Sequence, residues 1–206
     1  MINDQNVTAI ITGVAGILGV AIGSVIGVMQ AWLTKLVSRK EKATYLALIV
    51  APQLDIFIGR CLDIAYDDGT ERGRPAGSNG HHQTTIAPPE FNPLGFEAEW
   101  QSIPKNLMFN IMMLAQAKGK IEAYLDGDFE GFYDPPDHKK YFLARRYAYT
   151  KLGLEATKLL TQLRKYVDMP PMIDGEEQAQ KLKNIYSDLT VLRNRHKKST
   201  SPITKS

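Results

Sequence analysis

The sequence has little cysteine, and it has a long stretch without charged residues near its N-terminus. Cys61 is the single cysteine among 206 residues, so an intrachain disulfide is excluded and a reducing compartment is indicated. No charged residue occurs between Asp4 and Lys35, and a helix needs only about 20 apolar residues to cross the hydrocarbon core of a bilayer. This uncharged stretch therefore predicts a segment that lies in a membrane.

Residues 7–34 are predicted to form a single transmembrane helix. A lone segment in lipid must satisfy its backbone hydrogen bonds internally, which only a helix can do. A cleaved signal peptide is not expected, because residues 1–6 contain no Lys or Arg and the apolar run is much longer than a signal-peptide core. Residues 1–6 are then expected to be a short extracytoplasmic N-terminus.

Small residues occur at every fourth position within this segment. They are Ala15, Gly19, Gly23, Gly27 and Ala31, and we name them the small-residue ridge. Positions four apart lie on one side of a helix, and small side chains there let a second helix approach closely. The ridge predicts a homo-oligomer formed through the transmembrane helix, with membrane lipid as the other partner of this segment.

The two flanks of the predicted span differ in charge. The N-terminal flank carries Asp4 alone, whereas the residues after the span that we assign to the membrane interface are Trp32, Lys35, Arg39, Lys40 and Lys42. Basic residues beside a span remain in the cytoplasm, and aromatic residues favour the interface. We therefore expect the N-terminus outside the membrane, which is the cytoplasmic membrane if the protein is bacterial, and the C-terminal part in the cytoplasm.

The rest of the chain predicts an all-α fold. Apolar periodicity marks helices over residues 41–66, 102–125, 137–168 and 174–192. The chain is then a single transmembrane helix followed by a cytoplasmic bundle of about four helices with one long loop. Its parts are a juxtamembrane and cytoplasmic helical domain at 35–168, whose loop is 67–101, and a C-terminal helix with a basic, flexible tail at 169–206.

The first of these cytoplasmic helices carries a heptad-like apolar seam. Its residues, spaced alternately three and four apart, are Ala47, Val50, Leu54, Phe57, Cys61 and Ile64. Two interpretations are open. The seam either continues back into the transmembrane helix as one long rod with a kink or break at Pro52, or it belongs to an amphipathic helix packed on its own domain.

The helix predicted over residues 137–168 has one apolar and one basic face. Its apolar residues are Tyr141, Ala144, Ala148, Leu152, Ala156, Leu159 and Leu163. The basic residues between them, Arg145 and Arg146 included, are then expected to face solvent.

Residues 67–101 are rich in glycine, proline and polar side chains and show no periodicity. A segment of this kind is a functional loop or a disordered one, and its apolar residues between Phe91 and Trp100 are expected to pin its second half to the domain. His81 and His82 are adjacent in the first half. Neighbouring side chains of an extended chain point to opposite sides, so we predict a disordered pair rather than two ligands of one ion.

An acidic segment separates the second and third cytoplasmic helices. Its carboxylates are Asp126, Asp128, Glu130, Asp134 and Asp137. Oxygen ligands at positions 1, 3 and 5 with glycine at 6 match the start of a calcium-binding EF-hand loop, but Asp137 stands where a longer Glu is needed, after Pro135 and Pro136. The alternative is a turn in which Asp134 and Asp137 cap the next helix, so the segment is a weak metal candidate.

Catalytic motifs are also lacking. The sequence has no phosphate-binding loop, no dinucleotide-binding glycine motif, no zinc motif and no serine nucleophile elbow, so we expect neither an enzyme nor a cofactor. A basic stripe interleaved with aromatic residues is lacking too, so no nucleic acid partner is expected.

The remaining class is a single-pass, membrane-anchored, self-associating helical protein. We expect it to act as an interaction or scaffold module at the cytoplasmic face, with an unknown cytoplasmic protein as its partner. The alternative is an oligomeric pore-forming or membrane-perturbing effector built from the glycine-ridged transmembrane helices.

Overall fold

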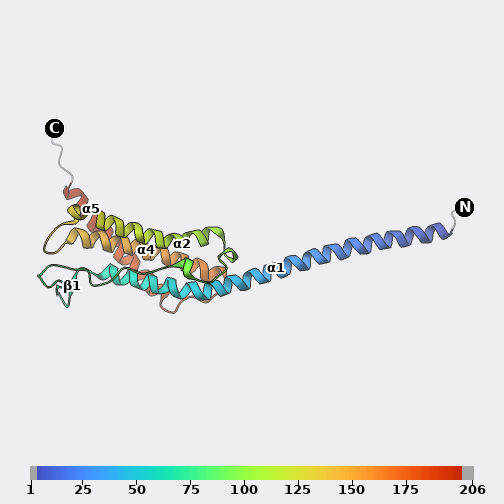
Figure 1. Ribbon diagram of the computed structural model, residues 1–206, viewed down its shortest axis with the longest axis horizontal. Helices are drawn as coiled ribbons and strands as arrows, with labels where there is room; N and C mark the ends of the chain where they lie inside the picture. Colours follow the sequence, from blue (N-terminus) through green and yellow to red (C-terminus); the bar gives the residue numbers. More distant parts are fainter. Residues whose placement is uncertain (1–3, 201–206) are drawn as a thin grey trace, which may run out of the picture. The chain divides into compact units, whose positions relative to one another are not determined.

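A computed structural model describes the backbone of residues 4–200 and the side chains of residues 29–30, 32–128 and 131–196. The chain is mostly helical, which confirms the all-α prediction (Figure 1). The helices are α1 (Asp4–Tyr66), α2 (Lys105–Gly127), the short α3 (Phe129–Phe132), α4 (Lys139–Tyr166) and α5 (Gly175–Thr200). A two-stranded hairpin, β1 (Thr70–Glu71) and β2 (Arg74–Pro75), and two short 3-10 turns, η1 (Pro93–Gly95) and η2 (Trp100–Ser102), lie between α1 and α2.

The chain divides into two compact units, Met1–Lys42 and Ala43–Ser206. Within the described residues, one helix near the N-terminus is long and apolar enough to cross a membrane, over Trp32–Tyr66. The part of that stretch from Ala43 onward belongs to the second unit and carries buried core residues. The side chains of the small-residue ridge and of nearly all of the predicted span at 7–34 lie outside the described residues, so both stay predictions.

The second half of α1 is the central core helix of the second unit. All six residues of the apolar seam are fully buried, and they share one cluster with side chains of α2, α4 and α5. The helix continues through Pro52, which is exposed. The seam therefore packs on its own domain, as the second interpretation predicted. The backbone of α1 is also one continuous helix from Asp4 to Tyr66, as the first interpretation predicted, and no break occurs at Pro52.

Helix α4 packs against both α2 and α5. On α2 the apolar residues Leu107, Ile111 and Leu114 are buried, and α5 contributes Leu182 and Leu189 to the interior. Helix α5 extends to Thr200, so residues 193–200 are helical where the composition predicted a flexible tail.

The face that α4 buries differs from the predicted one near its N-terminus. Leu152 is buried as expected, but before it Phe142 and Arg145 are buried, while Ala144 and Ala148 are only half-buried. In the first half of α4 the buried face is thus rotated about the helix axis relative to the predicted apolar stripe. Ala144 and Ala148 face a groove described below.

Candidate functional site

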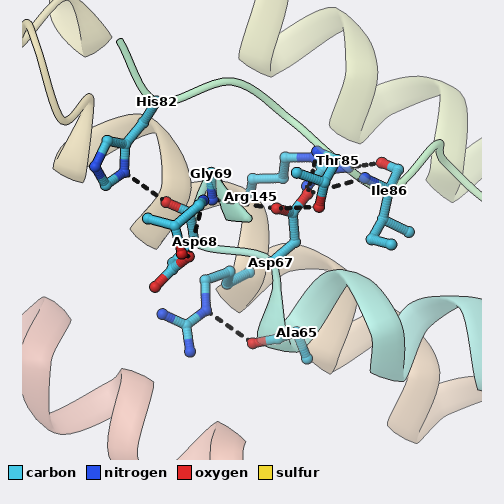
Figure 2. Close-up of polar contacts among 10 residues, drawn as sticks. Ala65, Asp67, Asp68, Gly69, His82, Thr85, Ile86 and Arg145 are labelled. Carbon is cyan, nitrogen blue, oxygen red and sulfur yellow. Dashed lines mark hydrogen bonds and ion pairs between the residues drawn. The ribbon is translucent and has the colours of Figure 1, made fainter. Parts of the chain in front are cut away.

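Asp67, the first residue after α1, forms a buried ion pair with Arg145 of α4 (Figure 2). The Arg145 side chain is 2% exposed, and its Nη1 lies 2.7 Å from Oδ2 of Asp67. The prediction that Arg145 faces solvent is therefore wrong. A buried guanidinium is tolerated when a carboxylate neutralises it and further hydrogen bonds satisfy both groups.

Those further bonds come from the long loop. Thr85 donates to Asp67 from its backbone N–H and its hydroxyl, at 3.1 and 2.9 Å, and the N–H of Ile86 donates at 3.2 Å. Arg145 donates in turn to the carbonyl of Ile86. Burial raises the pKa of Asp67, but the hydrogen bonds from Gly69, Thr85, Arg145 and Ile86 outweigh it and hold the pKa below its usual range.

Gly69 allows the loop to turn tightly beside this pair. Its φ of +80° is strained for other residues, and a Cβ there would meet the ring of Phe142 and lie 2.8 Å from Cβ of His82. Arg146 fixes the other side of the junction, because its Nε donates to the carbonyl of Ala65 at 2.7 Å. The loop is therefore ordered where it leaves α1, so the second of the two interpretations left open, a disordered segment, does not hold there.

The ordered loop brings together two segments that the sequence keeps far apart. The N–H of His82 donates to the carbonyl of Pro136 at 2.9 Å, and its Nε2 lies 3.7 Å from Oδ1 of Asp137. Nδ1 of His82 donates to the carbonyl of Asp68 at 2.8 Å (Figure 2). The part of the long loop that carries His81 and His82 and the acidic segment thus form one site. Neither the histidine pair nor the acidic residues indicated this site on their own.

His81 meets the same turn through His138. Nδ1 of His81 and Nε2 of His138 are 3.5 Å apart. We name His81, His82 and His138 the histidine cluster. Nothing in the sequence pointed to His138, because its partner lies 57 residues away and no motif spacing joins them.

A cavity of about 380 Å³ opens beside the histidine cluster. It is lined by His82, Gln83, Thr84, Leu125, Asp126, Phe132, Tyr133, His138, Tyr141 and Phe142. Four of these side chains are aromatic and the polar ones carry few charges, so the cavity suits a small ligand with a flat or apolar body.

The acidic segment contributes little charge to this cavity. Asp126 lines it, whereas Asp137 pairs with Lys139 at 2.8 Å. His138 takes the cap position of α4 without a side-chain cap bond, so the predicted capping carboxylates do not fill that role. Among the described residues no three His, Cys, Asp or Glu side chains are grouped to hold a metal ion; the side chain of Glu130 is outside that set.

A second hollow of about 330 Å³, which we name the basic groove, lies along α2, α4 and α5. Small and apolar side chains are among its lining residues, together with three cationic side chains. The lining residues are Ala117, Lys120, Ile121, Tyr124, Ala144, Tyr147, Ala148, Lys151, Leu152, Glu155 and Arg193. The guanidinium of Arg193 lies 4.5 Å from the ring centre of Tyr147. Alanine floors allow close approach, and the cations favour an acidic partner.

The structure gives no support for Cys61 as a catalytic nucleophile. The thiol is buried in the seam, and burial raises its pKa, so it stays protonated and inert.

Comparison of the chain with protein-family models, with curated proteins and with solved structures found no match.

Proposed function

We propose that the chain is a single-pass membrane protein whose helical bundle serves as an interaction or scaffold module at the cytoplasmic face. The observation that carries this proposal is the position of the uncharged stretch between Asp4 and Lys35. It precedes the second unit in the sequence, and among the described residues the buried core starts at Ala43. Lipid is the environment that would bury an uncharged stretch of this length.

The residues just before the bundle support the same conclusion. Trp32, Leu33 and Val37 are exposed at 60%, 48% and 58%. Soluble domains rarely leave such a run uncovered, whereas the interface of a bilayer accommodates aromatic and apolar side chains beside a basic cluster. The basic residues after the span place the bundle on the cytoplasmic side in this proposal.

The basic groove supports a protein partner of a particular kind. Three alanines line it, which would let an apolar helix face approach closely, and Lys120, Lys151 and Arg193 outnumber the single acid, Glu155. An amphipathic helix with acidic flanks has the complementary shape and charge. We therefore propose an acidic helical segment of a cytoplasmic protein as the ligand of the module.

The test is fractionation and topology mapping of the full chain in bacterial cells. We expect it to stay in the membrane pellet after alkaline carbonate washing, with a C-terminal fluorescent protein active and a C-terminal alkaline phosphatase inactive. The control is Ile17→Asp with Leu18→Asp, since each central Asp opposes insertion by roughly 3 kcal/mol. Recovery of the parent chain in the soluble fraction would reject the anchor.

A pore is the second candidate, because the small-residue ridge could also pack many helices into a ring. The lack of charged residues in the span disfavours a wide aqueous channel. Overproduction of a pore depolarises cells, so an intact membrane potential at high expression would count against this alternative.

A further inference from the structure

The facing nitrogens of His81 and His138 have the separation of two ligands of one metal ion. Nδ1 of His81 lies 3.5 Å from Nε2 of His138, which is longer than the usual hydrogen bond of about 2.7–3.2 Å. Two imidazole nitrogens bound at about 2.0–2.1 Å to a tetrahedral Zn²⁺ are about 3.3 Å apart. The spacing lies at the long limit of a hydrogen bond and also fits two nitrogens that ligate one ion.

The backbone holds both rings in this arrangement. His138 has a φ of +49°, a left-handed conformation that is uncommon for residues other than glycine and that histidine, asparagine and aspartate adopt more often than most, and its N–H donates to the carbonyl of Asp134 at 2.7 Å. His81 closes a turn in which its carbonyl accepts from the N–H of Gly77 at 2.9 Å. Strained residues gather at functional sites, where the surrounding structure maintains them.

We propose that His81 and His138 bind a first-row divalent transition-metal ion such as Zn²⁺. Neutral imidazole is a preferred ligand of zinc, copper and nickel, whereas calcium and magnesium prefer oxygen. Both rings are only half-buried, so water completes the coordination. The bound ion joins the long loop to the N-terminus of α4, across 57 residues of sequence.

His82 does not take part, although it lies beside the pair. Its Nδ1 is occupied by the carbonyl of Asp68, and its Nε2 is directed to Asp137. The proposal rests on His81 and His138 alone and is independent of the proposed membrane function.

The test is titration of the full chain with ZnCl₂ in detergent micelles at pH 7.5, purified without a polyhistidine tag. Calorimetry should show one saturable ion per chain, and the melting temperature should rise with zinc but not with the same concentration of CaCl₂. His81→Ala and His138→Asn should each weaken binding at least about tenfold. Asparagine is chosen at position 138 because it tolerates the positive φ.

His196→Ala is the matched control, because His196 is the histidine outside the cluster, and it should bind zinc as the parent does. The melting temperatures of the variants without metal establish that they are folded. Unchanged zinc affinity in His138→Asn, or a parent chain that shows no saturable binding, would overturn the proposal.

Discussion

At the scale of single residues, the pair of Asp67 and Arg145 joins the long loop to the bundle. Removing one member of a buried pair leaves an uncompensated charge and costs about 3–5 kcal/mol. Arg145→Met should therefore lower the free energy of unfolding by that amount in urea titrations of the full chain in micelles. The control is Lys158→Met on the same helix, whose side chain is exposed and which should change stability by less than about 0.5 kcal/mol. Equal effects of the two variants would show that the pair contributes nothing.

The same pair predicts a pH dependence. The folded pKa of Asp67 is lower than its ordinary value, so its contribution to stability is complete above the ordinary aspartate pKa of about 3.9. That contribution is lost as the pH falls towards the lower, folded pKa. The difference in melting temperature between the parent and Asp67→Asn should thus be largest near pH 6 and shrink below pH 4. A constant difference from pH 6 to pH 2.5 would contradict the assignment.

At the scale of helices, Gly153 sets how closely three of them pack. A Cβ added to Gly153 on α4 would lie 2.9 Å from Cβ of Cys61 on α1 and 3.3 Å from Leu182 on α5. Gly153→Ala should destabilise the bundle by about 1–3 kcal/mol through overpacking, although alanine is the better helix former. Gly119→Ala on α2, which has nothing within 4 Å, should stabilise it by about 0.5–1 kcal/mol. Thermal unfolding of both variants checks the pair, and stabilisation by Gly153→Ala would show that the helices are not in close contact there.

Periodicity predicted which segments are helical but not the whole of their buried faces. The seam of α1 packs into the hydrophobic core, and its regular spacing alone identified it. In α4 the buried face includes Arg145, whose burial depends on Asp67, 78 residues earlier in the chain. A pattern read within one helix carries no information on such a distant partner, and the basic residue was therefore placed on the solvent side.

At the scale of the whole molecule, the order of the long loop was the feature that composition could not predict. The loop is polar and rich in glycine, yet it is ordered because Asp67 and Arg145 bind Thr85 and Ile86. In the same folded arrangement His82 meets the acidic segment at Pro136 and Asp137. Two separate weak motifs in the sequence thus become one site through tertiary contacts, which explains why each motif alone indicated little.

Self-association through the small-residue ridge stays a prediction, and it belongs to the scale of the whole molecule. A leucine on the ridge forces two helices apart, whereas a leucine on another face does not. Native mass spectrometry of the full chain in nanodiscs should show a discrete oligomer that Gly23→Leu dissociates, with at least about tenfold weaker association, and that Val20→Leu leaves intact. If both variants stay assembled, helices of the bundle hold the oligomer instead. A ring of five or more copies would favour the pore, and a dimer would favour the anchored module, because a narrow pore needs several helices around its axis.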